Sequence, residues 1–100
     1  MNITTVVSNL KRALEAAPEV ANAAISVYFE KEYDLQTGDP DWSAYILVFP
    51  SDFTHLCELL HLVPDYKTKP AYAKLSARLV QGVHIFPPPP RTTESSDEQV

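Results

Sequence analysis

The amino-acid sequence predicts an α+β fold, a two-layer sandwich in which helices pack on a small, mostly antiparallel three-stranded sheet. The chain has 100 residues, 45% of them hydrophobic, which suffices for one core but not for two. Apolar residues recur with helical spacing in three segments and with strand spacing in three others. These segments follow the order α-β-β-α-α-β. Short linkers between them favour helices on one face of a sheet.

Hydrophobic residues are concentrated in residues 1–86, which are expected to form a single α+β domain. Residues 87–100, PPPPRTTESSDEQV, contain one hydrophobic residue, Val100. Four consecutive prolines exclude helix and central strand and predict a rigid exit, followed by a disordered polar tail. Phe86 and the prolines after it resemble the ligands of EVH1 domains, and Pro87 and Pro90 have the spacing of SH3 ligands. At the C-terminus, Glu98-Gln99-Val100 resembles a motif that docks through its terminal carboxylate. A tail without a docking role is the alternative interpretation.

The first half of the chain predicts one helix and two strands. A helix is expected over residues 4–17 and ended by Pro18, with its apolar face made by Ile3, Val6, Val7, Leu10, Ala13, Leu14 and Ala17. Residues 24–30 alternate in polarity, which is typical of a half-buried strand. Residues 42–49, WSAYILVF, are apolar on both strand faces, which is typical of a central strand.

The second half predicts two helices and a last strand. Ser51 is the expected N-cap of the second helix, Asp52 lies in its first turn, and Pro64 ends it. A third helix is expected after Lys69, with an apolar stripe and Gly82 as its C′ residue. Residues 83–86 then form a short strand.

This element order resembles that of the type II KH domain and of BolA-like proteins. A KH domain clamps nucleic-acid backbone with a Gly-x-x-Gly loop between helices. The corresponding linker, from Val63 to Lys69, contains no glycine. The resemblance is therefore one of element order, and no KH residue is assigned to this chain.

Composition excludes several classes of protein. A single cysteine allows no intramolecular disulfide and no four-cysteine zinc site. No segment approaches the roughly 18 consecutive apolar residues of a membrane span, and the N-terminus lacks the pattern of a signal peptide. With Gly38 and Gly82 as the two glycines, there is no P-loop, nucleophile elbow or dinucleotide fingerprint. We expect a cytoplasmic protein with no cofactor.

The second predicted helix carries residues suited to two kinds of chemical site. His55, Cys57, Glu58 and His61 lie close enough along the helix to share a metal, but no second Cys/His cluster completes a site. Cys57 or Ser51 could act as a nucleophile if His84 approached them in the fold. The alternative, a small core cysteine with solvated histidines, is favoured, so no metal and no catalytic residue is assigned.

Charge is distributed unevenly. Residues 30–41 carry five acidic residues against Lys31, a net charge of −4, and residues 65–78 carry Lys67, Lys69, Lys74 and Arg78 against Asp65, a net charge of +3. An acidic loop can compete for a partner's basic groove, although solvated acidic turns are also common. Four dispersed cations on a chain of net charge −5 make nucleic-acid binding an unfavoured alternative.

The functional hypothesis is a small non-enzymatic interaction protein. It would act as a stoichiometric inhibitor or adaptor. The analogy is with some mobile-element inhibitors of host nucleic-acid-binding defence complexes. Three short helices need not cover both apolar faces of the central strand, so an uncovered aromatic face would be a surface for a partner protein or a second copy. The alternative is a helix on each face, or a tail that folds back over the sheet. The alternatives are an RNA-binding domain and a small His/Cys metal protein or enzyme. The expected partner-binding residues are Tyr28, Glu30, Glu32, Asp34, Asp39, Asp41, Trp42 and Tyr45.

Overall fold

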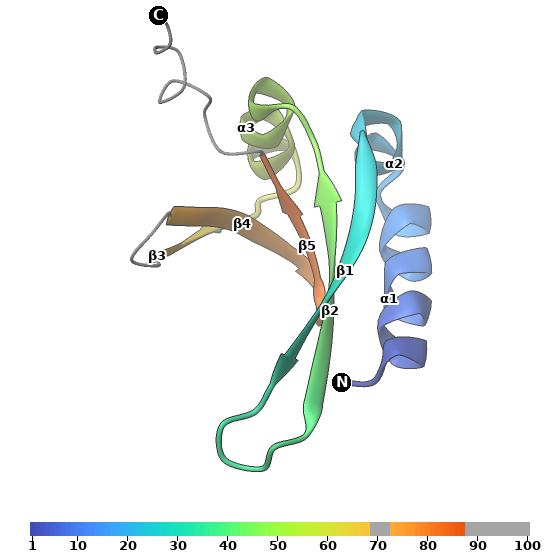
Figure 1. Ribbon diagram of the computed structural model, residues 1–100. Coiled ribbons are helices and arrows are strands. Elements are labelled where there is room, and N and C mark those ends of the chain that lie inside the picture. The colour runs from blue at the N-terminus through green and yellow to red at the C-terminus, as the bar shows by residue number, and fades with distance from the viewer. Residues whose placement is uncertain (69–72, 88–100) are drawn as a thin grey trace, which may run out of the picture.

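The computed structural model describes residues 1–68 and 73–87 and has a small α+β fold (Figure 1). The elements along the chain are α1 (Ile3–Ala16), α2 (Pro18–Ala23), β1 (Ser26–Tyr33), β2 (Pro40–Leu47), α3 (Pro50–Leu59), β3 (Pro64–Thr68), β4 (Ala73–Val80) and β5 (Val83–Phe86). The strands form one mixed sheet in the order β1-β2-β5-β4-β3. The β2–β5 pair is parallel and the other pairs are antiparallel. The predicted α+β class is confirmed, whereas the predicted three-stranded sheet and the order α-β-β-α-α-β are wrong.

The first helix forms where its periodicity predicts it. The side chain of Asn2 accepts a hydrogen bond from the Thr5 backbone N–H at 2.8 Å and caps α1. Val6 and Ala13 are buried on its inner face. Pro18 follows the end of α1 as predicted, but it also begins α2, because proline needs no N–H partner in a first helical turn.

The first two strands form an antiparallel hairpin that is shifted along the chain from the predicted ranges. Tyr28 pairs with Tyr45, and the register runs without a bulge from Ser26 opposite Leu47 to Tyr33 opposite Pro40. Val27 and Phe29 share one face of the sheet with buried Ile46, as the alternation predicts. The predicted half-burial of this strand is wrong, because β1 lies at the edge of the sheet and both side chains are 38% exposed. β2 lies between β1 and β5, so its predicted interior position in the sheet is confirmed.

The third predicted helix is wrong. Residues 73–80 form the strand β4, and residues 64–68, predicted as a linker, form the strand β3 that pairs with it. Leu75, Ala77 and Leu79 alternate with polar residues, so the segment fits a strand as well as a helix. Pairing with β5 selects the strand. Gly82, predicted as a helix C′ residue, instead lies in the turn between β4 and β5 with φ of +78°. The predicted start of that helix at 69–72 lies outside the described residues.

The second predicted helix is present as α3 but differs at both ends. Phe49 is the N-cap and Pro50 the first helical residue, so Ser51 lies inside the helix and is not its cap. The helix ends at Leu59, five residues before Pro64. The cause is the left-handed conformation of His61, which allows the Leu62 N–H to bond the Cys57 carbonyl at 2.8 Å.

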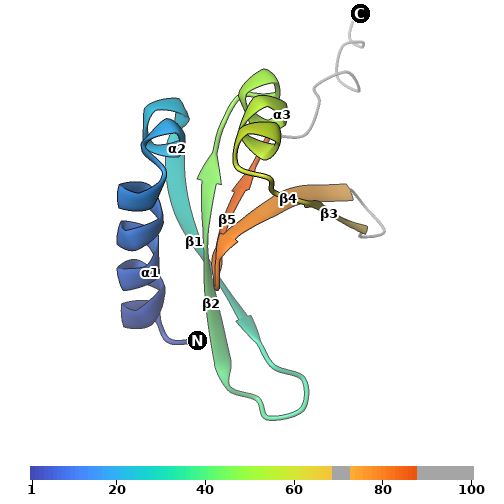
Figure 2. The ribbon, with the colours of Figure 1, turned by 180° about the vertical axis from the view of Figure 1, so that it is seen from behind.

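All three helices of the described chain share a single core on one face of the sheet. α1 packs against β2, β4 and β5, and α3 against β5 (Figure 2). The core joins residues from these helices and strands, among them Val6, Val20, Ile46, Val48, Phe53, Leu56, Val83 and Ile85. The β3–β4 hairpin bends away from β1 and β2, which gives the sheet a strong curvature (Figures 1 and 2).

Two further features concern the predicted limits of the domain. No helix among the described residues is long and apolar enough to span a bilayer. Residues 88–100 lie outside the described part of the chain. The polyproline exit, the SH3-like spacing and the C-terminal docking motif therefore stay predictions.

Candidate interaction surface

The β1–β2 hairpin extends well beyond the rest of the sheet (Figure 1). β5 pairs with β2 only from Ala44 to Leu47, so the residues of β2 before Ala44 have β1 on one side and no described strand on the other. On that open side, the Trp42 N–H bonds the Met1 carbonyl at 2.9 Å. We call residues 26–47 the β1–β2 arm. The arm presents its outer half to solvent from several sides.

The loop at the end of the arm is held in one conformation by Asp34. Its carboxylate accepts hydrogen bonds from the backbone N–H groups of Gln36 at 2.7 Å and Thr37 at 3.3 Å, and its carbonyl accepts one from Gly38 at 2.7 Å. Gly38 has φ of +76°, which suits glycine. The loop holds Leu35 fully exposed, at 101% of its reference area. An apolar side chain is thus presented from an ordered acidic loop.

The helix-free face of the sheet carries an aromatic row. Tyr28, Tyr45 and His84 stack across β1, β2 and β5, with centroid separations of 5.5 and 5.2 Å, and Phe86 packs edge-on against both tyrosines. Tyr45 and Phe86 are buried although no described helix covers this face. Tyr28, which lies on the outermost strand, is 39% exposed. The predicted aromatic face therefore exists, but mostly as a small second core with one accessible edge.

Trp42 does not belong to that face. It packs partly buried against the main core, on the helix side of β2, and so lies on the opposite face from Tyr28 and Tyr45. The Lys31 ammonium lies 5.7 Å from the Trp42 ring centroid and 5.2 Å from that of Tyr33. Side chains of the predicted partner-binding set are therefore divided between two faces of the arm. A single flat contact would not reach all of them.

The predicted acidic residues lie along the arm. Glu30 and Glu32 alternate with Lys31 on β1, and Glu32 lies directly opposite Asp41 on β2. Asp34 and Asp39 lie at the loop, where the Asp34 N–H bonds the Asp39 carbonyl at 3.0 Å. The Asp41 carboxylate accepts a hydrogen bond from the Met1 amino group at 2.7 Å. The outer half of the arm thus carries a net negative charge.

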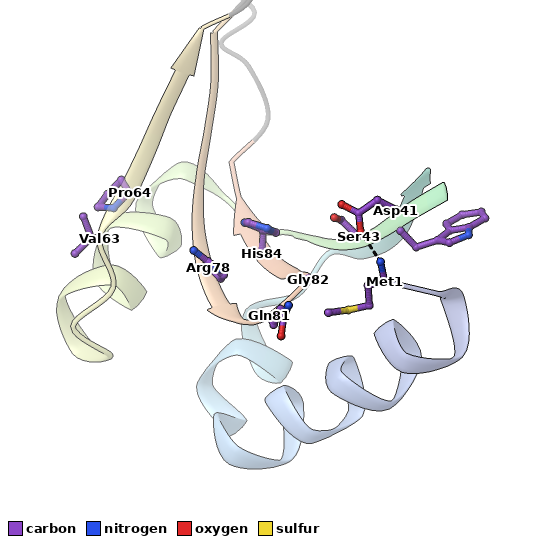
Figure 3. A pocket seen from close by; sticks show the side chains of 10 residues that line it. Met1, Asp41, Ser43, Val63, Pro64, Arg78, Gln81, Gly82 and His84 are labelled. Atoms are coloured by element: carbon purple, nitrogen blue, oxygen red, sulfur yellow. Dashed lines mark hydrogen bonds and ion pairs between the residues drawn. The ribbon is translucent and has the colours of Figure 1, made fainter. Parts of the chain in front are cut away.

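A polar depression of about 590 Å³ lies where β2, β4 and β5 meet on the helix-free face (Figure 3). Ser43, Arg78 and His84 point into it from the three strands, and Gln81 and Met1 lie at its rim. Arg78 is exposed, so water screens its charge. Asp41 also lines the depression, and its carboxylate is paired with the Met1 amino group. The depression offers polar groups for contact at the base of the arm.

Three of the residues considered for chemistry, Cys57, Glu58 and His61, line a depression of about 450 Å³ beside α3 and the turn that follows it. Burial, followed by the nearby Glu58 carboxylate, raises the pKa of the Cys57 thiol. A thiol with a raised pKa stays protonated at neutral pH and is a weak nucleophile and metal ligand. Among the side chains that the structure describes, in residues 1–64 and 75–87, no three His, Cys, Asp or Glu are grouped so that they could hold a metal ion. His55 and Ser51 are exposed on the same helix.

Comparison of the chain with models of known protein families, with curated proteins and with solved structures found no match. The element order observed here also removes the resemblance to the type II KH domain, because a strand replaces the third helix. The function must therefore be argued from the surface itself.

The expected partner-binding set omits six residues of this surface: Ile25, Val27, Phe29, Lys31, Tyr33 and Leu35. The alternation of residues 24–30 predicts Val27 and Phe29 on a buried face, and Lys31 contributes to the sequence analysis only as a charge. Their significance depends on the position of β1 at the edge of the sheet. The signal that could have drawn attention to Leu35 is a lone large apolar residue in a turn, between Asp34 and Gly38.

Proposed function

We propose that this chain is a non-enzymatic protein-interaction module that binds a partner through the β1–β2 arm and acts as an adaptor or stoichiometric inhibitor. One observation carries the proposal, the apolar side chains exposed along β1 and at its two ends. Val27, Phe29 and Tyr33 form a row on one face of β1, in which Lys31 lies between the last two. Tyr28 lies on the other face, Ile25 precedes the strand and Leu35 follows it, and all six apolar residues are at least 38% exposed. Single exposed apolar residues are ordinary, but several gathered on one projecting hairpin are typical of a binding surface.

The charge of the arm supports the same function. Five acidic residues surround the apolar row and give residues 30–41 a net charge of −4. Apolar anchors surrounded by charge of one sign are typical of protein interfaces, in which the apolar centre supplies affinity and the charges supply specificity and association rate. The partner would present an apolar contact surface with basic groups around it.

Site-specific photocross-linking in cells that express the full chain would test this function. A photoreactive phenylalanine analogue is placed at Tyr33 or Leu35, and at Lys11 as the control, since Lys11 is equally exposed but lies on α1. We expect both arm positions to cross-link the same protein and Lys11 to give no such product. Absence of a product from both arm positions, or an equal yield from Lys11, would contradict the proposal.

A further inference from the structure

The outer edge of β1 has backbone groups that point away from the sheet. The N–H groups of Trp42 and Ala44 on β2, and of Val48 just after it, bond the carbonyls of Met1, Gly82 and Phe86, so these residues point their N–H away from β1. Hydrogen-bonding direction alternates along a strand. The intervening residues of β2 therefore bond β1, and the residues of β1 opposite Trp42, Ala44 and Ile46 point outward.

Those outward-pointing residues are Val27, Phe29 and Lys31. Their backbone N–H and C=O groups form one side of β1, and no described strand pairs with that side. An unpaired row of donors and acceptors is a template for a further strand. The edge of β1 can therefore accept one more strand without changing any pairing within the sheet.

The first half of β1 lacks the devices that usually protect an edge strand. Protected edges are short, or carry charged side chains, proline, a bulge or an inward-pointing charge. β1 is 8 residues long, contains no proline and pairs with β2 without a bulge, and its charged residues, Glu30, Lys31 and Glu32, all lie in its second half. In its first half, Val27, Tyr28 and Phe29 are apolar and 38–39% exposed. Such an edge is suited to pairing with a strand of matching chemistry.

The two faces of β1 differ in chemistry, and this difference identifies the strand that would fit. On the helix-free face, Tyr28 is followed by Glu30 and Glu32. On the helix side, Val27 and Phe29 share the face with the core. Side chains of an added strand alternate between the same two faces. Basic residues on one face and apolar residues on the other would therefore complement β1.

We propose that the β1 edge binds an extended segment of a partner protein, with alternating basic and apolar residues, as an additional strand of the sheet. This inference rests on the proposed function and specifies how the arm binds. Main-chain hydrogen bonds to Val27, Phe29 and Lys31 hold the segment. Its basic side chains lie beside Glu30 and Glu32, and its apolar side chains pack on Val27 and Phe29.

Synthetic peptides test the proposal without knowledge of the natural partner. The probe is a peptide of alternating lysine and valine, matched to the 8 residues of β1, and the full chain is titrated while backbone amide signals are followed by NMR. We expect the amides of Val27, Phe29 and Lys31 to shift and to become protected from hydrogen exchange. A glutamate–valine peptide should bind at least about tenfold more weakly, and raised salt should weaken the lysine peptide. A lysine–valine peptide with alternate backbone amides methylated should lose binding.

A matched pair of variants tests the backbone contact from the protein side. Lys31→Pro removes an outward N–H that no described strand uses, and proline is tolerated at such edge positions. Lys31→Thr removes the same side chain and its ring contacts but keeps the N–H. We expect Lys31→Pro to weaken binding of the lysine–valine peptide by about tenfold or more relative to Lys31→Thr.

The outcomes separate this inference from the function on which it rests. Equal binding of the methylated and unmethylated peptides, or of the Lys31→Pro and Lys31→Thr variants, would overturn strand addition. If Tyr33 and Leu35 still cross-linked a partner, the proposed function would stand. A dimer that dissociates on Lys31→Pro but not on Lys31→Thr would identify a second copy of this chain as the occupant and would also overturn the proposal. If neither peptide binding nor cross-links from the arm were observed, both strand addition and the proposed interaction function would be contradicted.

Discussion

Replacing His61 by glycine is expected to stabilise the fold. His61 follows α3 with φ of +56°, the left-handed conformation that side chains with a Cβ adopt at a cost. It occupies the C′ position of a Schellman motif, in which the Leu62 N–H bonds the Cys57 carbonyl at 2.8 Å. The His61 side chain is exposed, and Leu62 packs against the core. The substitution therefore relieves backbone strain at residue 61 and removes few side-chain contacts.

The magnitude follows from two opposing effects. A left-handed conformation costs a residue with a Cβ about 1–2 kcal/mol relative to its right-handed alternatives. Glycine also has more conformational entropy in the unfolded chain, and this lowers the free energy of unfolding by about 0.4–1 kcal/mol. The free energy of unfolding should rise by about 1 kcal/mol. For a domain of this size that raises Tm by about 4–8 °C.

His61→Ala is the matched control, because alanine removes the imidazole but keeps the Cβ. Both variants are compared with the unaltered chain by thermal denaturation followed by circular dichroism and by urea titration. We expect the alanine variant to melt close to the unaltered chain and the glycine variant to melt above both. A glycine variant that melts at or below the alanine variant would refute the assignment of a strained left-handed residue at this position.

Four further perturbations test other parts of the structure. Ile46→Ala should lower the free energy of unfolding by about 2–5 kcal/mol in urea titration, because Ile46 is fully buried in β2. Leu35→Ala should change it by less than about 0.5 kcal/mol, since Leu35 is fully exposed, and a loss comparable to that of Ile46→Ala would be inconsistent with this exposure. Asp34→Ala should cost about 0.5–1.5 kcal/mol, since it removes the acceptor of two loop N–H groups, and unchanged loop amide exchange would argue against that role. Because burial and Glu58 raise the pKa of folded Cys57, its contribution to stability should be constant below the ordinary thiol pKa of about 8.5 and fall as pH rises through that value. Cys57→Ala should remove that decline, and an identical decline in the variant would assign it to another group.

The first helix and the hairpin show how much of the fold could be predicted from the sequence. Val6 and Ala13 recur with helical spacing, and Val27 and Phe29 alternate with polar residues, so both elements follow from patterns confined to a few adjacent residues. Phe49 and Pro50 displaced the predicted cap at Ser51 because a proline at the first helical position satisfies the helix start equally well.

The candidate surface was predicted only in part. The acidic residues and Tyr28 lie on the arm, as the composition of residues 30–41 suggested. Trp42 lies on the opposite face from Tyr28 and Tyr45, and Tyr45 is buried by its aromatic neighbours. Both outcomes depend on which strands lie beside β2 and on how far the sheet curves. Neither property is encoded in a short stretch of sequence.

By itself, the sequence determined the amphipathic helix at the start, the alternation of β1, the apolar β2 and the negative charge of the arm. These are properties of spacing and composition. Tertiary structure alone decided that residues 73–80 are a strand, because their apolar spacing suits either conformation and only pairing with β5 distinguishes them. It also decided that β5 inserts between β2 and β4, so that β1 remains at the edge. Strand order is fixed by hydrogen bonds between residues far apart in the chain, and for that reason the surface proposed here becomes visible only in the folded molecule.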